Sequence, residues 1–207
     1  MVNGPSVVRY GPEVPGDDEL RLLGNLDGKR VLELGSGSRS SAVALAARGA
    51  HVIAVDPHPD RMAVSQVAAE DAEVRVEWQE GALTDLAFLR GDSVDLAFSV
   101  GAVVEVEDMG RLFRQVHRVL RPGSAFVFAY EHPALVSGRH RSYFDESPAT
   151  VDVDGVTVTQ YPRTISAVFT ALHRSGLRVD AILEPQPVDS LATLPTTIIW
   201  RARKEGV

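Results

Sequence analysis

The chain has 207 residues, enough for one domain of moderate size, and we expect a single domain over residues 1–207. Its hydrophobic share of 44% is ordinary for a globular protein, and the absence of cysteine excludes disulfides, thiolate catalysis and cysteine-ligated zinc. The net charge of −7 without a basic block disfavours a nucleic-acid partner, and no signal-like or membrane-spanning apolar run occurs, which favours a cytoplasmic protein without a membrane partner.

An N-terminal arm and a short helix are expected over residues 1–27. Glycines and prolines interrupt residues 1–16, whereas residues 17–26 begin with two acids and then place leucines at helical spacing. Tyr10 is the only large aromatic side chain of the arm. It either closes as a lid over a bound ligand, and then belongs to a cofactor site, or it packs as an anchor.

Residues 29–60 follow the pattern of a strand, a glycine loop, a helix and a second strand. The first strand stops at Gly35, Ser36 and Gly37, and the second strand ends at Asp56. Short apolar strands that alternate with helices predict a parallel sheet covered on both faces. In such a sheet the ligand lies at the carboxyl ends of the strands.

Two acids flank the glycine loop and indicate which ligand fits it. The glycines let the backbone approach a ligand closely, which suits a dinucleotide equally well. Glu33 would repel a pyrophosphate but suits a cationic ammonium or sulfonium, and Asp56 stands where a carboxylate accepts from ribose hydroxyls. Together they predict a site for an adenosyl ligand with a positively charged tail. In the alternative, Glu33 is a solvated strand end and Asp56 caps the next helix.

These motifs resemble a known family. Residues 31–37, VLELGSG, and 52–56, VIAVD, are similar to the first two motifs of class I S-adenosylmethionine-dependent methyltransferases, especially the small-molecule, methyltransferase type 11-like branch. Residues 113–123 resemble the helix and turn before that family's fifth strand. The resemblance implies an α/β Rossmann-like fold, a doubly wound seven-stranded sheet with its last strand antiparallel, and S-adenosyl-L-methionine as cofactor. We expect cofactor contacts from Glu33, Gly35, Ser36, Gly37, Asp56, Pro57, Ala82, Leu83, Ser99 and, as a lid, Tyr10.

Ala82 and Arg39 depart from the family's pattern. The family usually places an aspartate after the third strand, predicted here at 74–78, to hold the adenine amino group, and Ala82 occupies that position. Apolar contact and the backbone N–H of Leu83 are then expected to hold the ring. Arg39 stands where the family often has a third glycine, so its side chain must point away from the loop or cover the ligand.

Two candidate general bases follow the fourth and fifth strands. The fourth strand delivers Ser99 to the ligand, and Glu105 lies a few residues beyond it. Glu105 either faces the reaction centre as a base or, with neighbouring acids, begins the helix predicted at 109–120. His132 follows the strand predicted at 125–130, where it is either a general base with a pKa near neutrality or a hydrogen-bonding structural residue.

Residues 134–163 are expected to form a cap insertion with a hairpin. Valines alternate with polar residues on both sides of Asp154 and Gly155, a pair typical of a two-residue hairpin turn. Either the cap shapes the acceptor site, or its apolar face packs on the core or on a partner in a homodimer. In the first case the acceptor-binding residues are His140, Tyr143, Phe144, Tyr161 and Arg163.

The rest of the chain predicts a helix at 164–175 and strands at 177–183 and 196–203, the last being the antiparallel strand of the family. We expect an enzyme that transfers a methyl group to an O, N or C atom of a small-molecule acceptor, mainly by positioning and exclusion of water. The histidines and acids lack metal-ligand spacing, so no metal is expected. Two other functions stay open: a methyltransferase-like binding or regulatory protein without catalysis, and an NAD-dependent oxidoreductase.

Overall fold

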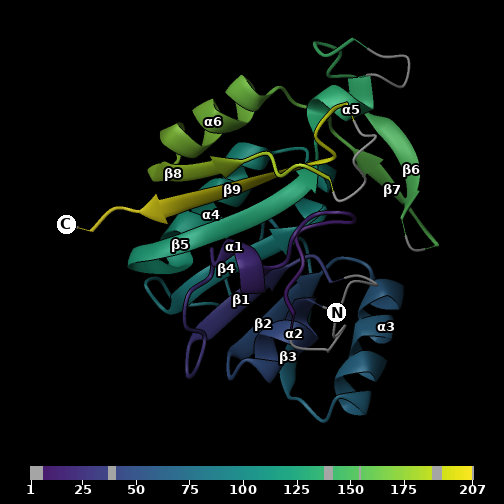
Figure 1. Cartoon of the computed structure of the whole chain (residues 1–207). Coiled ribbons are helices and arrows are strands. Elements are labelled where there is room, and N and C mark those ends of the chain that lie inside the picture. The colour runs from purple at the N-terminus through teal and green to yellow at the C-terminus, as the bar shows by residue number, and fades with distance from the viewer. Residues whose placement is uncertain (1–6, 37–40, 138–141, 154, 188–192, 207) are drawn as a thin grey trace.

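The computed structural model describes residues 7–36, 41–137, 142–153, 155–187 and 193–206. A seven-stranded sheet runs through it in the order β3-β2-β1-β4-β5-β9-β8 (Figure 1). β3, β2, β1, β4 and β5 are parallel neighbours, and β9 is antiparallel to both β5 and β8. The strands are β1 (Arg30–Leu34), β2 (His51–Asp56), β3 (Val76–Glu80), β4 (Val94–Val100), β5 (Leu120–Glu131), β8 (Leu177–Leu183) and β9 (Thr197–Lys204). The predicted doubly wound sheet with an antiparallel last strand is confirmed.

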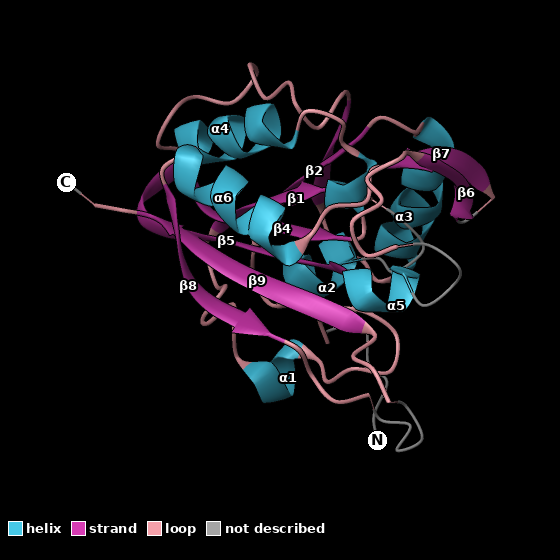
Figure 2. Cartoon of the chain, turned by 90° about the horizontal axis from the view of Figure 1, so that it is seen from above, coloured by secondary structure: helices cyan, strands magenta, loops and turns pink. Residues whose placement is uncertain are grey.

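Helices cover both faces of the sheet (Figure 2). α4 and α6 pack on one face, and α2 with the segment around α1 packs on the other. The helices are α1 (Asp17–Leu20), α2 (Ser41–Ala47), α3 (Pro59–Asp71), α4 (Met109–Val119), α5 (Pro133–Ser137), α6 (Ile165–Arg174) and the short 3-10 helix η1 (Ala102–Glu105). Neither α5 nor η1 is apparent in the sequence pattern, since each is only one turn long.

The central strand β1 shows why both faces must be covered. Leu32 and Leu34 belong to the core beneath α4 and α6, whereas Val31 belongs to the core beneath α2. All three side chains are buried, as a parallel strand in the middle of such a sheet requires. The apolar residues of this strand, which flank Glu33, therefore belong to two cores rather than one.

β5 begins at Leu120, before the strand predicted at 125–130, and two other predicted elements have different bounds for a clear local reason. The helix expected at 17–26 ends at Leu20, because Arg21 takes a left-handed conformation (φ 52°) and the N–H groups of Leu22 and Leu23 donate to the Asp17 carboxylate. The third strand begins at Val76 rather than at residue 74, because the N–H of Val74 still donates to the Ala69 carbonyl of α3. The Asp17 carboxylate sets the first boundary and the end of α3 sets the second, and hydrophobic periodicity predicts neither.

The predicted hairpin forms a separate two-stranded sheet of β6 (Ala149–Val153) and β7 (Val156–Gln160). It lies with α5 beyond the carboxyl end of β5 (Figure 1). The N–H of Tyr161, just after β7, donates to the carbonyl of Val104 in η1 at 2.8 Å. We call β6, β7 and residues 161–163 the cap; Asp154 of its turn lies outside the described residues.

Within the described ranges, no helix combines the length and the apolar character needed to cross a bilayer.

Candidate functional site

The carboxyl ends of β1, β2 and β4 are held together by hydrogen bonds just where the glycine loop begins. The N–H of Gly35 donates to the Val55 carbonyl at 2.8 Å, and the Ser99 hydroxyl donates to the Leu34 carbonyl at 2.7 Å. The three strand ends are therefore in register, as an active site at this edge of the sheet requires.

Gly35 allows a close approach that a side chain would prevent. Its φ is +85°, and a Cβ at this position would lie 2.1 Å from the Cβ of Ala102 in η1. The beginning of the glycine loop therefore packs directly against η1, and only glycine fits there.

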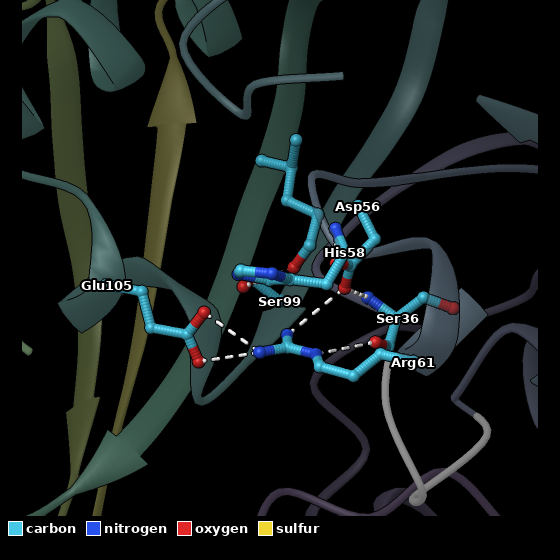
Figure 3. A network of polar contacts seen from close by, with 7 residues as sticks. Ser36, Asp56, His58, Arg61, Ser99 and Glu105 are labelled. Atoms are coloured by element: carbon cyan, nitrogen blue, oxygen red, sulfur yellow. Dashed lines mark hydrogen bonds and ion pairs between the residues drawn. The ribbon is translucent and has the colours of Figure 1, made fainter. Parts of the chain in front are cut away.

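Asp56, at the end of β2, is fully buried and accepts three hydrogen bonds (Figure 3). Its Oδ1 accepts from the His58 N–H at 2.7 Å, and its Oδ2 accepts from the Ser36 N–H at 2.6 Å and from Arg61 Nη2 at 3.1 Å. The carboxylate thus joins the glycine loop to the start of α3. It does not cap that helix in the expected way, because the N-cap residue of α3 is His58.

Arg61 connects Asp56 to Glu105. Its Nε donates to the Ser36 carbonyl at 3.2 Å, and its Nη1 lies 3.0 and 2.9 Å from the two Glu105 carboxylate oxygens. The side chains of Arg61 and Glu105 are 4% and 10% exposed, so this ion pair is largely shielded from water. Figure 3 shows the guanidinium between the two carboxylates. Arg61 was not predicted; its place in the first turn of a helix that starts beside Asp56 was the only available signal.

Glu33 has a different environment from the one expected for a solvated strand end. It is 3% exposed, and burial raises the pKa of its carboxyl group to about 8, against the opposing effect of the Ser41 hydroxyl and the Ala42 N–H. Glu33 is therefore mainly protonated at neutral pH. The negative charge that the sequence places on both sides of the loop is smaller in the folded protein, since Arg61 also compensates Asp56.

Two buried polar atoms beside the glycine loop have no hydrogen-bond partner among the described residues: Glu33 Oε2 and Ser36 Oγ. A buried polar atom without a partner costs free energy, so such atoms mark places where a ligand with complementary groups gains affinity. Their position beside Asp56 fits an adenosyl ligand that carries an ammonium group, because that ligand brings hydrogen-bond donors to both ends of the loop.

Comparison with known families identifies this arrangement. Residues 32–128 match a family model described as a methyltransferase domain, and this range includes every residue of the network around Asp56. This part of the chain is similar to methyltransferase domains. The predicted resemblance to class I S-adenosylmethionine-dependent methyltransferases is confirmed by this match together with the fold.

The curated relatives that match this part of the chain have names that refer to ubiquinone and menaquinone. The chain is 31% identical over 109 residues to the ubiquinone biosynthesis O-methyltransferase of Azorhizobium caulinodans, a match that covers 53% of this chain and 43% of that enzyme. It is 34% identical over 122 residues to the demethylmenaquinone methyltransferase of Clavibacter sepedonicus, covering 54% of this chain and 47% of that one. The chain thus matches less than half the length of either relative.

Solved structures match nearly the whole chain. An S-adenosylmethionine-dependent methyltransferase from Mesorhizobium loti has a TM-score of 0.71 and 27% identity, covering 89% of this chain and 94% of that chain. A Listeria monocytogenes protein assigned to the same class has a TM-score of 0.75 at 22% identity, covering 90% and 95%, and at that identity it supports the fold alone.

The other predicted cofactor residues lie in several environments. Pro57 and Ala82 are exposed on the loops after β2 and β3, whereas Leu83 is buried in the core beneath α4 and α6. The Ser99 hydroxyl donates to the Leu34 carbonyl at the end of β1. Gly37, like Arg39, lies outside the described residues.

Tyr10 packs against the sheet. The ring is fully buried 6.0 Å from that of Phe98, and its hydroxyl donates to Asp17 Oδ1 at 2.6 Å. Arg48 forms an ion pair with the other oxygen of Asp17 at 2.6 Å. These are the contacts of a packing anchor, the second of the two roles that the sequence left open.

His132 is buried at the carboxyl end of β5, and both of its ring nitrogens have partners. Nδ1 accepts from the Ala134 N–H at 3.1 Å, so the proton is on Nε2, which lies 2.8 Å from Glu184 Oε1. Glu184 was not predicted, because it lies 52 residues away in the sequence. The pair has the form of a base with an orienting carboxylate, while the Ala134 contact also places His132 at the start of α5.

The predicted acceptor residues surround the contact between the cap and η1. The Tyr143 hydroxyl accepts from the Ile165 N–H at 3.0 Å, and Arg163 donates to the carbonyls of Tyr161, Val106 and Glu107. Burial lowers the pKa of Arg163. His140 lies outside the described residues, and the Phe144 side chain is 79% exposed. Asp108, rather than Glu105, caps α4 through the Arg111 N–H.

Proposed function

We propose that this protein transfers the methyl group of S-adenosyl-L-methionine to an O, N or C atom of a small-molecule acceptor. The observation that supports this proposal most strongly is the pair of unpartnered buried atoms, Glu33 Oε2 and Ser36 Oγ, beside Asp56 within a methyltransferase domain. A quinone precursor or a related ring compound is the acceptor class suggested by the names of the curated relatives.

Each residue of the cofactor site has a task in this proposal. Asp56 accepts hydrogen bonds from the ribose hydroxyls, Glu33 accepts from the ammonium group, and the backbone at Gly35 permits close approach. Bound S-adenosylmethionine supplies an activated methyl group on a positively charged sulfur. The protein then has to align the acceptor with that methyl group and keep water out, because positioning contributes most when the leaving group is already good.

His132 is the group that we propose as a base for acceptors with a tightly held proton. Its Nδ1 is the unprotonated nitrogen, and Glu184 holds the opposite side of the ring. Nδ1 becomes available when the hydrogen bond from Ala134 is given up. Tyr143, Tyr161 and Arg163 are proposed to shape the acceptor side through their positions between the cap, η1 and α6.

Ligand binding separates this proposal from its alternatives. S-adenosylhomocysteine should raise the melting temperature and bind in calorimetry, whereas NADH should do neither, since only a ligand that prefers the native state stabilises it. Turnover of S-adenosylmethionine with a panel of hydroxylated quinone precursors then tests catalysis. Binding without turnover of any acceptor would favour a regulatory protein, and binding of NADH instead would favour an oxidoreductase.

A further inference from the structure

Asp56 has too few free acceptor sites for the task proposed above. A carboxylate offers about four lone-pair sites, and three are occupied by the Ser36 N–H, the His58 N–H and Arg61 Nη2. The side chain exposes no surface to solvent. Two adjacent ribose hydroxyls that both donate to Asp56 require one more site than remains, so one present donor has to leave.

Arg61 is the donor that can leave with the smallest rearrangement. The Ser36 and His58 contacts, at 2.6 and 2.7 Å, come from backbone N–H groups at strand and helix ends, whereas the Arg61 contact is longer, at 3.1 Å, and comes from a side chain. Arg61 also has a second carboxylate within reach, because its Nη1 already contacts both oxygens of Glu105.

Glu105 makes this movement possible without leaving a buried charge unpaired. A buried cation that loses its only partner is strongly destabilised, but Arg61 retains Glu105 and the Ser36 carbonyl when it releases Asp56. Glu105 is anchored in η1, whose first residue, Ala102, packs against Gly35. Both carboxylates and the arginine therefore form one connected group beside Gly35.

We propose that Arg61 is a positioning residue of the cofactor site. In the ligand-free protein Arg61 pairs with both Asp56 and Glu105. When ribose hydroxyls bind to Asp56, Arg61 releases Asp56 and pairs with Glu105 alone. Glu105 accordingly serves as the acceptor that retains Arg61, and not as the general base. This inference rests on the proposed function, because it requires an adenosyl ligand at Asp56.

A double-mutant cycle tests the exchange. S-adenosylhomocysteine affinity is measured by calorimetry for the wild type, Glu105→Gln, Arg61→Met and the double variant. Glu105→Gln should raise the Kd about tenfold, within the range of coupled neighbours, because Arg61 then has only Asp56 as a charged partner. Arg61→Met should bind at least as tightly as the wild type, and Glu105→Gln should have no further effect in that background.

Matched controls separate this coupling from folding defects. Glu107→Gln removes an exposed acid two residues from Glu105 and should leave the Kd unchanged. Circular dichroism and melting temperatures show whether each variant is folded. If Arg61→Met alone is unfolded, the double variant replaces it in the comparison with Glu105→Gln. The double variant has the same net charge at these three positions as the wild type, because it loses one carboxylate together with the arginine. The Glu105→Gln substitution should weaken binding of the 2′-deoxy analogue of S-adenosylhomocysteine less than binding of S-adenosylhomocysteine itself, because the analogue donates one fewer hydrogen bond to Asp56.

Kinetics with S-adenosylmethionine supply a second readout. The loss in Glu105→Gln should appear in KM for S-adenosylmethionine, whereas a lower kcat at saturation with an unchanged Kd would assign Glu105 to proton transfer and overturn the inference. An unchanged Kd in Glu105→Gln, or an equal loss with and without Arg61, would overturn it as well. Failure of the wild type to bind S-adenosylhomocysteine is a different result, which defeats the proposed function itself.

Discussion

The cofactor end of the sheet and the cap are built in different ways. Glu33, Asp56 and Arg61 are at most 5% exposed, and Asp56 forms an ion pair with Arg61, whereas Tyr143, Tyr161 and Arg163 are half-buried and are held mainly by hydrogen bonds to backbone groups. A two-stranded hairpin is marginally stable by itself, so β6 and β7 depend on such contacts. Buried charged groups therefore hold the ends of β1 and β2 together, whereas backbone hydrogen bonds hold the cap.

η1 lies between these two regions and touches both. On one side, Ala102 packs on Gly35 and Glu105 binds Arg61; on the other side, the carbonyl of Val104 accepts from the Tyr161 N–H. We therefore expect that substitutions at the cofactor end alter the affinity for the cofactor, and that substitutions in the cap leave this affinity unchanged.

The largest effect is expected from Asp56→Asn. This change keeps the shape of the side chain but removes the charge and one acceptor, so it weakens charge-assisted hydrogen bonds to ribose and raises the Kd for S-adenosylhomocysteine on the order of 100-fold. Calorimetry measures the change. Asp60→Asn, an exposed acid in the same segment, is the control, and equal affinities in all three proteins would remove Asp56 from the site.

Glu33 should make the stability of the protein depend on pH. Its pKa is about 8 in the folded protein and near 4.5 when unfolded, so the folded state holds a proton that the unfolded state releases between these values. The contribution of this group to stability is complete below about pH 4.5 and decreases by up to about 1.4 kcal/mol per pH unit as the pH rises toward 8. Urea denaturation at several pH values measures this slope.

Glu33→Gln is the matching control for that pH dependence. The amide cannot ionise, so the slope between pH 5 and pH 8 should be smaller than in the wild type by the share that belongs to Glu33. Identical slopes in the two proteins would mean that the Glu33 carboxyl group titrates normally despite its burial.

A smaller effect is expected in the cap, from Arg163→Met. Loss of the hydrogen bonds to the carbonyls of Tyr161 and Val106 should raise amide hydrogen exchange in β6 and β7 about tenfold, with a higher KM for the acceptor. The Kd for S-adenosylhomocysteine should stay at the wild-type value. Arg114→Met, on the exposed side of α4, is the control, and a weakened cofactor affinity in Arg163→Met alone would break the separation of the two regions.

The smallest effect is expected from Tyr10→Phe. The hydroxyl donates to Asp17, so its removal should lower the free energy of unfolding by about 1 kcal/mol without a change in S-adenosylhomocysteine affinity. Denaturant unfolding and calorimetry measure the two quantities. A weaker ligand affinity at unchanged stability would assign Tyr10 to the lid instead.

Much of the fold follows from local patterns in this sequence. The bounds of β8 coincide with the strand predicted at 177–183, and β9 and α6 differ from the predicted ranges 196–203 and 164–175 by one residue at each end. Local patterns suffice there because exposure alternates along β8 and one side of α6 is buried, and both patterns are visible within a few residues of sequence. The glycine loop and Asp56 were recognised for the same reason: their spacing is set within one strand–loop–helix–strand unit.

The chemistry of the site depended on contacts between distant segments. Arg61 pairs with Glu105 across 44 residues of sequence, and His132 pairs with Glu184 across 52. Sequence alone therefore determined that Asp56 lies at the end of β2 beside the glycine loop. Only the tertiary structure decided how much charge this site carries, because burial protonates Glu33 and an arginine from α3 compensates Asp56; both effects arise from three-dimensional surroundings that spacing along the chain does not encode.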